Sequence, residues 1–300
     1  GNTYKLSGEY IVEEGATLHI EEGVKIIAVY DDIADYILVK QGGKINAVGT
    51  PDKPIVMTSE KEEPGAWGGI HICGRAHTNA EGGKGSSEIG GAVYGGNDDA
   101  DNSGTLQYIR LEYTGFAFDE EHEANGISFY GVGNGTIVDH CQAYKGSDDG
   151  FEFFGGSVNV SNLVAVSCSD DSFDWTEGWN GKGTNLVAYQ EAESTLGYDC
   201  DCLMECDNNG SNNAATPVAH PVLKNLILVG NGGSKQGIRL RAGTEVEIDN
   251  AKVCGKGQPL TVETALTENA LKNGTSKLTN ITLTSELSSK EGIYTHADFI

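Results

Sequence analysis

Short runs in which apolar and polar residues alternate recur along this chain, and no stretch shows a long helical period. In the run Asp149-Gly-Phe-Glu-Phe, Phe151 and Phe153 lie two positions apart with Glu152 between them. An alternation of period two predicts a β-strand whose apolar side chains point inward and whose intervening side chain points outward. Runs of the same form begin at Asn125, Asp171 and Gln236, and Leu203-Met-Glu fits the form less well.

One of these runs repeats at a fixed interval. The segment Gly146-Ser-Asp-Asp-Gly-Phe-Glu-Phe returns as Cys168-Ser-Asp-Asp-Ser-Phe-Asp-Trp, a shift of 22 positions from 146 to 168. Near the N-terminus, Gly15-Ala-Thr-Leu-His-Ile is echoed by Gly42-Gly-Lys-Ile-Asn-Ala, a shift of 27 positions from 15 to 42. Periods of this length are typical of solenoids, in which each repeat forms one coil and buries its apolar face against its neighbours.

An asparagine precedes a second set of apolar runs, about half a coil after the first set. The members are Asn162, Asn185, Asn225, Asn250 and Asn280, with His140 in the equivalent place. Asparagine tolerates the backbone conformations of bends. Amides stacked on coils about 4.8 Å apart can also hydrogen-bond to one another along the axis. The pattern therefore predicts an asparagine ladder at one corner of the coil.

These features together predict an all-β fold, a right-handed parallel β-helix that forms a single-stranded solenoid with long loop excursions. A β-sandwich also has short strands at close spacing, but it does not explain why one acidic and aromatic motif recurs after a fixed interval. We expect a single β-helix domain over residues 1–300. Its parts are irregular N-terminal coils (4–65), a loop excursion (74–103), regular coils (104–190), a second loop excursion (191–220) and C-terminal coils (221–300).

The chain of 300 residues is strongly acidic, with a formal net charge of −24. Binding a polyanion needs a basic face, so this charge excludes nucleic acid as a partner. No apolar run reaches the roughly 18 residues of a transmembrane helix. Because no signal peptide precedes the first strands, we expect that a leader or a lipid anchor stood before Gly1.

The seven cysteines are an odd number, so at least one thiol is free if the others pair. Cys200, Cys202 and Cys206 cluster without the paired spacing or the histidine partners of a zinc site. The sequence alone does not decide whether two of these three cysteines form a disulfide.

Several motifs resemble those of a group of exported, often lipid-anchored, Bacteroides-type proteins of the pectin-lyase-like β-helix superfamily. The motifs are Gly15-Ala-Thr-Leu, Gly49-Thr-Pro-Asp-Lys-Pro-Ile-Val, Trp67-Gly-Gly-Ile, Asp101-Asn-Ser-Gly-Thr-Leu, Asp148-Asp-Gly-Phe-Glu-Phe-Phe-Gly-Gly and Asp170-Asp-Ser-Phe-Asp-Trp-Thr-Glu-Gly-Trp. The resemblance covers about residues 10–255. It implies the β-helix fold and an extracytoplasmic location, at the cell surface or outer membrane. The wider superfamily includes polysaccharide lyases, glycoside hydrolases and non-catalytic surface proteins, so it leaves the activity open.

Paired acidic residues are the first candidates for chemistry. If the coils stack, Asp148 lies above Asp170 and Asp149 above Asp171, each pair about 4.8 Å apart. Two ionised carboxylates so close repel, so either one keeps a proton or a cation bridges them. Ca²⁺ takes six to eight oxygen ligands, which makes these four aspartates candidate calcium ligands. The alternative is that they shape turns and accept hydrogen bonds from backbone N–H groups.

A second acidic pair lies on the outward face of the predicted strands. Glu152 and Asp174 fall one coil apart, near the roughly 5–5.5 Å that separates the two carboxyl groups of a retaining glycosidase. Arg239 falls in the same column and could act as the base of a lyase, or could simply form an ion pair. Polygalacturonase-like β-helices use a Gly-His-Gly segment and an Arg-Ile-Lys segment. Gly237-Ile-Arg-Leu-Arg is weakly similar to the latter, whereas no Gly-His-Gly occurs in this chain.

The aromatic residues fall into two sets. Those in phase with the strands are expected to stack in the core: Phe151, Phe153, Phe173 and Trp175. Those out of phase could form a platform on which sugar rings stack: Tyr130, Phe154, Trp179 and Tyr198.

Three classes of function follow from these features. The leading prediction is an extracytoplasmic surface β-helix that binds a glycan or other extended polymer along its side without catalysis. The second is a polysaccharide lyase or glycoside hydrolase with Glu152, Asp174 and Arg239 as catalytic residues. The third is a structural surface scaffold or an accessory protein of a transporter, in which the acidic ladders only stabilise the coil.

Overall fold

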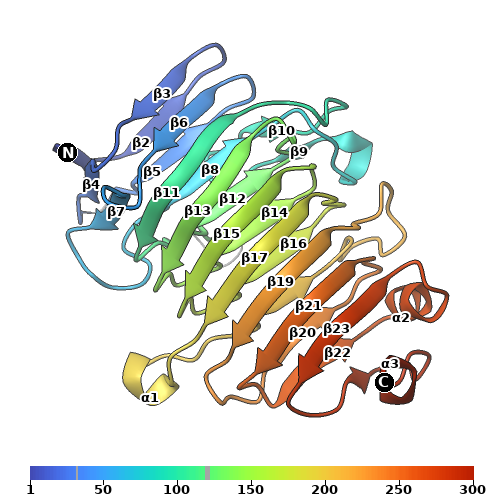
Figure 1. Ribbon diagram of the computed structural model, residues 1–300. Coiled ribbons are helices and arrows are strands. Elements are labelled where there is room, and N and C mark those ends of the chain that lie inside the picture. The colour runs from blue at the N-terminus through green and yellow to red at the C-terminus, as the bar shows by residue number, and fades with distance from the viewer. Residues whose placement is uncertain (32, 119–121) are drawn as a thin grey trace.

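The chain winds into a right-handed parallel β-helix, as the repeats predict (Figure 1). The computed structural model describes residues 1–31, 33–118 and 122–300. Phe151 pairs with Phe173 in neighbouring parallel strands, and Leu18 pairs with Ile45. The shifts of 22 and 27 residues are therefore the lengths of coils, and the predicted fold class is confirmed.

Ten short strands form one face of the helix, on which equivalent residues of successive coils lie side by side. The strands are, in order, β2 (Glu9–Val12), β5 (Tyr36–Val39), β8 (Ile70–Cys73), β12 (Ile127–Tyr130), β14 (Phe151–Phe154), β16 (Phe173–Thr176), β18 (Met204–Cys206), β20 (Gln236–Leu240), β22 (Gln258–Val262) and β24 (Ser288–Ser289). This ten-stranded sheet carries the Glu152 and Asp174 positions.

A twelve-stranded sheet forms the other two faces. In the N-terminal coils each face has its own strand, and β6 and β7 pair with the first and second halves of β11. From β11 onward one long strand covers both faces. The members are β1 (Thr3–Leu6), β3 (Thr17–Ile20), β4 (Lys25–Ala28), β6 (Lys44–Val48), β7 (Ile55–Ser59), β11 (Gly104–Glu112), β13 (Ile137–Tyr144), β15 (Asn159–Val166), β17 (Lys182–Tyr189), β19 (Val222–Val229), β21 (Glu247–Cys254) and β23 (Lys277–Leu283).

A single residue in the left-handed conformation bends each long strand at the corner between these two faces. The corner residues, whose φ angles lie between 52° and 63°, are Tyr108, His140, Asn162, Asn185, Asn225, Asn250 and Asn280. The amide of Asn185 donates to Asn162 (2.9 Å), and that of Asn225 donates to Asn185 (3.0 Å). Asn250 continues the series by donating to Asn225 (2.8 Å). The predicted ladder is confirmed, although its asparagines lie within the strands rather than before them.

Aromatic rings stack in the core along the helix axis. The ring centroids of Phe151 and Phe173 are 5.6 Å apart, and those of Phe129 and Phe153 are 5.0 Å apart. Trp175 is fully buried beside them. The in-phase aromatic residues therefore occupy the core, as predicted, because parallel in-register pairing places each ring over its equivalent in the next coil.

The segment 74–103 leaves the coil and folds over the outer side of the ten-stranded sheet. It contains the 3-10 helix η1 (Glu81–Gly83) and an antiparallel pair, β9 (Gly85–Ser86) with β10 (Val93–Tyr94). Ile89 and Tyr94 pack against Tyr130 in a second apolar cluster outside the main core. The excursion thus covers the N-terminal part of this face and leaves the carboxylates of β14 and β16 beside its edge.

The segment 191–220 differs from the predicted excursion because it contributes a strand to the helix. After the short helix α1 (Glu193–Leu196), β18 pairs with both β16 and β20. Met204 takes the place held by Phe173 in the coil before, so Leu203-Met-Glu belongs to the same column after all. The cysteines of this segment are free thiols, as are the other cysteines of the chain.

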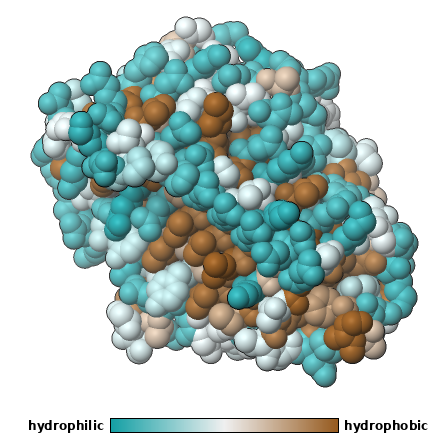
Figure 2. All heavy atoms as spheres, in the orientation of Figure 1, coloured by the Kyte–Doolittle hydropathy of each residue, from teal (hydrophilic) through white to brown (hydrophobic). Residues whose placement is uncertain are grey.

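Two short helices lie at the C-terminal end of the coil, α2 (Ala265–Lys272) and α3 (His296–Phe299). Leu271 and Tyr294 from this region join the main core. Among the described residues, every helix is too short or too polar to cross a bilayer. Figure 2 shows the side that carries the twelve-stranded sheet, where hydrophilic residues predominate and apolar residues gather in separate patches.

The corner conformation yields a prediction at Asn185. A left-handed conformation costs an ordinary L-residue about 1–2 kcal/mol, whereas glycine adopts it freely. We therefore expect Asn185→Ala to lower the free energy of unfolding, measured with urea, by more than Asn185→Gly does. At the neighbouring strand position the order should reverse, with Thr184→Gly more destabilising than Thr184→Ala. Equal or greater destabilisation by glycine at position 185 would contradict the role of the corner.

Candidate functional site

One column of side chains crosses the outward face of the ten-stranded sheet. Its members, in register from one coil to the next, are His71, Ser128, Glu152, Asp174, Glu205, Arg239 and Thr261. The structure therefore brings Glu152 and Asp174 together, as the repeat predicts. Arg239 lies farther away, because Glu205 occupies the coil between it and Asp174.

A second column stands at the starts of the same strands and joins each coil to the next. The side chain of Asn125 accepts a hydrogen bond from the backbone N–H of Asp149 (3.1 Å), and Asp149 accepts one from the N–H of Asp171 (2.8 Å). Asp171 in turn accepts the N–H of Cys202 (2.6 Å). One carboxylate oxygen of Asp149 and one of Asp171 thus accept a hydrogen bond from a backbone N–H group, as predicted if these aspartates shape turns. The second oxygen of each carboxylate is left for other interactions.

The two columns converge into one cluster of carboxylates. Asp149, Glu152 and Asp174 each offer an oxygen, and these three oxygens lie within 4.8 Å of one another. Asp148, Asp149 and Asp170 form a second such group. The fourth aspartate expected as a calcium ligand, Asp171, lies in two further groups, one with Asp174 and Glu205 and the other with Asp201 and Cys202.

Burial and mutual repulsion raise the pKa values of these carboxyl groups and so favour their protonated form. Burial raises the pKa of Asp148 to about 8, and the neighbouring charge of Asp170 adds to the effect. Burial also raises the pKa of Glu152 and that of Asp174 well above their usual range, as do the charges of nearby acids. The cluster must therefore hold protons or cations at neutral pH.

Two further polar residues surround this cluster, Asn125 just before β12 and Glu88 in the excursion, whose charge acts on Glu152. The amide of Asn125 donates to a carboxylate oxygen of Glu152 at 2.5 Å and to the hydroxyl of Ser128 at 3.0 Å. Glu88 reaches the site from the excursion, where it accepts a hydrogen bond from the Tyr130 hydroxyl (3.4 Å). Burial raises the pKa of Glu88 to about 7. Sequence reasoning missed Glu88, because a loop residue carries no periodic signal.

The excursion also forms a wall along the ends of the strands. Its first residues run along the helix axis, so that the N–H of Gly74 donates to the carbonyl of Tyr130 (2.8 Å). One coil further, the carbonyl of His77 accepts the N–H of Gly156 (2.7 Å), and the N–H of Asn79 then donates to Glu177 (3.0 Å). The segment 74–79 thereby ties successive coils together beside the carboxylates and fixes one border of the site.

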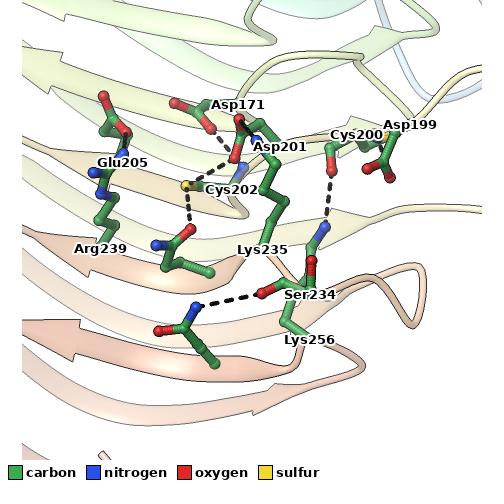
Figure 3. Close-up of polar contacts among 12 residues, drawn as sticks. Asp171, Asp199, Cys200, Asp201, Cys202, Glu205, Ser234, Lys235, Arg239 and Lys256 are labelled. Atoms are coloured by element: carbon green, nitrogen blue, oxygen red, sulfur yellow. Dashed lines mark hydrogen bonds and ion pairs between the residues drawn. The ribbon is translucent and has the colours of Figure 1, made fainter. Parts of the chain in front are cut away.

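Arginine side chains border the cluster on its C-terminal side, where each is held by acids. Arg239 contacts Glu205 (3.0 Å) and Glu263 (3.2 Å), as Figure 3 shows for Glu205. Arg241 pairs with Asp207 (2.7 Å) and also contacts Glu205. Burial lowers the pKa of Arg239, but the hydrogen bond to Glu263 and the charges of Glu205 and Glu263 together raise it above its usual range. Arg239 therefore stays protonated, and its geometry fits the ion-pair role better than that of a base.

The out-of-phase aromatic residues do not form a platform for sugar rings. Tyr130 and Phe154 stack on each other at 4.4 Å, and Trp179 stacks on Phe153 at 4.1 Å. All of these rings are buried, which leaves no face open to a ligand. Tyr198 is half-buried and donates its hydroxyl to the carbonyl of Ser167 (2.7 Å). The platform interpretation is wrong for Tyr130, Phe154 and Trp179, whose rings are buried, and the half-buried Tyr198 cannot form a platform with them.

A cavity of about 510 Å³ lies elsewhere, at the N-terminal end of the coil. Its walls include Leu6, Leu18, Ile20 and Ile26. This cavity opens onto the apolar interior of the first coils and lacks the convergent acidic groups found on β14 and β16, so the carboxylate cluster is the better candidate for chemistry.

Comparisons with known proteins identify structural neighbours and a family. A solved catalytic domain of a GH87 alpha-1,3-glucanase in complex with tetrasaccharides shares 10% sequence identity with this chain, with a TM-score of 0.26. The similarity covers 96% of this chain and 64% of that chain, and at these values it carries no inference about activity. Curated proteins give no match. The family described as a pectate-lyase-like beta helix domain matches residues 1–299, and the chain therefore belongs to this family.

Proposed function

We propose that this protein is a glycoside hydrolase that cleaves an extended glycan on the outward face of its ten-stranded sheet. The observation that carries the proposal is the in-register pair of Glu152 and Asp174, whose oxygens lie within 4.8 Å of each other and of Asp149. Glycosidic cleavage needs two carboxyl groups flanking the bond, and a close pair favours the double displacement that retains configuration.

The surroundings of the pair support a division of roles. Burial and nearby acids raise the pKa of both carboxyl groups, but the amide of Asn125 donates a hydrogen bond to Glu152 that offsets part of the rise, which makes Glu152 the better candidate for the nucleophile. Asp174 lies among the carboxylates of Asp171 and Glu205, which favour its protonated form and suit a general acid. Asp174 would protonate the leaving oxygen, and Glu152 would attack the sugar carbon from the opposite side.

An extended glycan fits the shape of the site better than a small molecule does. The outward column continues over successive coils, so several sugar units of one chain could lie along it. Binding without turnover remains the alternative, and it is the leading prediction from the sequence. Two observations favour hydrolysis over binding alone. The outward face carries paired carboxyl groups, and the aromatic rings on which sugars could stack are buried here.

An extracytoplasmic location, with attachment to the cell surface or outer membrane through a lipid, stays a proposal that depends on the family resemblance. Fractionation of the native host, with protease treatment of intact cells, tests it. Recovery of the protein in the cytoplasmic fraction, protected from protease added to intact cells, would contradict it.

Calcium binding is a second candidate function. The observation that favours it is the group formed by Asp148, Asp149 and Asp170, whose oxygens lie close enough to share one ion. Oxygen ligands of this kind suit Ca²⁺, and a bound ion would remove the repulsion between the carboxylates. The two candidate functions share Asp149, whose oxygen lies within 4.8 Å of those of Glu152 and Asp174, so a bound ion would lie beside the reacting pair.

Substitution of the reacting pair provides the test of hydrolysis. On a panel of neutral, amino and acidic polysaccharides, we expect product release that Glu152→Gln or Asp174→Asn reduces by about 10²–10⁴-fold, because each removes a proton-transfer or nucleophilic group. Glu247→Gln, which makes the same charge change on the twelve-stranded sheet, should leave the rate unchanged. Binding to a polysaccharide without any turnover would contradict hydrolysis and support the non-catalytic binding function instead.

The raised pKa of Asp148 predicts how stability depends on pH. Its folded-state pKa of about 8 exceeds the unfolded value of about 3.9, so the native state binds the proton more tightly. This contribution to stability is complete below about pH 4 and is lost as the pH rises to about 8. In the presence of a chelator, we expect Asp148→Asn to raise the free energy of unfolding more at pH 8 than at pH 5. The exposed Asp52→Asn should show no such difference, and an equal gain at both pH values would refute the assignment.

Calcium should raise stability if it binds the aspartate group. A ligand at 100 times its Kd adds about 2.7 kcal/mol to the free energy of unfolding of a protein that binds it only when folded. We therefore expect Ca²⁺ to raise the melting temperature of the wild-type chain at pH 7.5, and Asp148→Asn combined with Asp170→Asn to abolish the increase. Identical melting curves with calcium and with chelator would exclude this candidate.

A further inference from the structure

A lysine, an asparagine and an aspartate meet at turns on the C-terminal side of the helix, apart from the carboxylate cluster. The Nζ atom of Lys256 lies 2.9 Å from Oδ1 of Asn231 and 2.9 Å from the carbonyl oxygen of Cys200. The Nδ2 atom of Asn231 donates to Oδ1 of Asp199 at 2.7 Å. Figure 3 shows Lys256 reaching the backbone of Cys200, with Asp199 beside it.

The lysine has the properties of a nucleophile. Only 5% of Lys256 is exposed, and burial lowers the pKa of its amine below the usual range. A buried amine that loses its proton becomes nucleophilic, because its lone pair is free. The Nζ atom of Lys256 donates one hydrogen bond to the carbonyl of Cys200. Rotation about the Cε–Nζ bond can turn the lone pair of Nζ toward the side chain of Asn231.

The asparagine side chain is arranged as the electrophile. Its Oδ1 atom accepts a hydrogen bond from the backbone N–H of Gly233 (3.0 Å), and this donor stays in place when the Lys256 amine turns to the amide carbon. Donors on this oxygen stabilise the negative charge that develops when an amine adds to the amide carbon. Asp199 binds the opposite end of the amide, at the nitrogen that would leave, and it lies at the surface, where ammonia can escape.

We propose that Lys256 and Asn231 form an intramolecular isopeptide bond, with Asp199 as the proton carrier. The Nζ atom of Lys256 attacks Cγ of Asn231, so that an Nζ–Cγ bond forms and the Cγ–Nδ2 bond breaks. Asp199 takes one proton from the attacking nitrogen and delivers it to Nδ2, which leaves as ammonia. The step neither oxidises nor reduces any atom, and it needs no further reactant.

The bond would join two neighbouring coils. Asn231 follows β19 and Lys256 follows β21, and Val229 and Cys254 at the ends of these strands are in register. The cross-link would therefore run along the helix axis, parallel to the backbone hydrogen bonds between the coils. It would prevent these coils from separating, which suits a protein exposed to proteases or to mechanical load.

The mass of the intact chain tests this proposal. We expect the folded wild-type protein to weigh one ammonia less than its sequence requires, and a tryptic digest to contain a branched peptide that joins the Lys256 and Asn231 segments. Lys256→Met, Asn231→Ala and Asp199→Ala should each restore the full sequence mass. Lys252→Met, which removes an exposed lysine of β21, should keep the loss of ammonia.

Two results would overturn the proposal without any need for the variants to fold. The first is a full sequence mass for wild-type protein whose circular dichroism shows folded β-structure. The second is a loss of ammonia without a branched peptide, which would instead indicate a succinimide at Asn231-Gly232. Neither result bears on the proposed hydrolase, because the constellation lies outside the reacting pair.

Discussion

The structure depends on the parallel, in-register pairing of successive coils. This pairing places each residue beside its equivalent in the next coil, about 4.8 Å away. Where the repeated residue is apolar, as at Phe151 and Phe173, the result is a continuous core. Where it is an asparagine at a corner, the result is a ladder of amide hydrogen bonds that keeps the strands bent. Fold and stability therefore arise from the same geometry.

The same pairing concentrates charge where the repeated residue is acidic. Glu152 and Asp174 cannot move apart without breaking the ten-stranded sheet, so the fold holds their repulsion in place. Backbone N–H groups satisfy one oxygen each of Asp149 and Asp171, which makes the strand starts rigid. Carboxyl groups held this close could serve acid catalysis in their protonated form or bind a cation in their ionised form, which are the two functions proposed for them.

How far the sequence predicts this protein depends on whether a residue belongs to the repeat. The coil, the core stack and the pairing of Glu152 with Asp174 follow from the shift of 22 residues, and the corner ladder follows from the recurring asparagines. The place of Glu205 in the acidic column is hard to predict from the sequence, because its coil is longer and carries Met204 and Cys206 in place of aromatic residues. Glu88 lies in a loop whose path over the sheet is set by tertiary contacts, which no local pattern encodes.

The central claim is that acids of successive coils are neighbours whose charges interact. A double-mutant cycle with Glu152→Gln, Asp174→Asn and the double variant, with urea unfolding at pH 8 in the presence of a chelator, measures this interaction directly. The account predicts that each single substitution stabilises the protein and that the second adds much less than the first, with a coupling on the order of 1 kcal/mol. Effects that add within about 0.3–0.5 kcal/mol would show that the two carboxyl groups do not interact and would contradict the account.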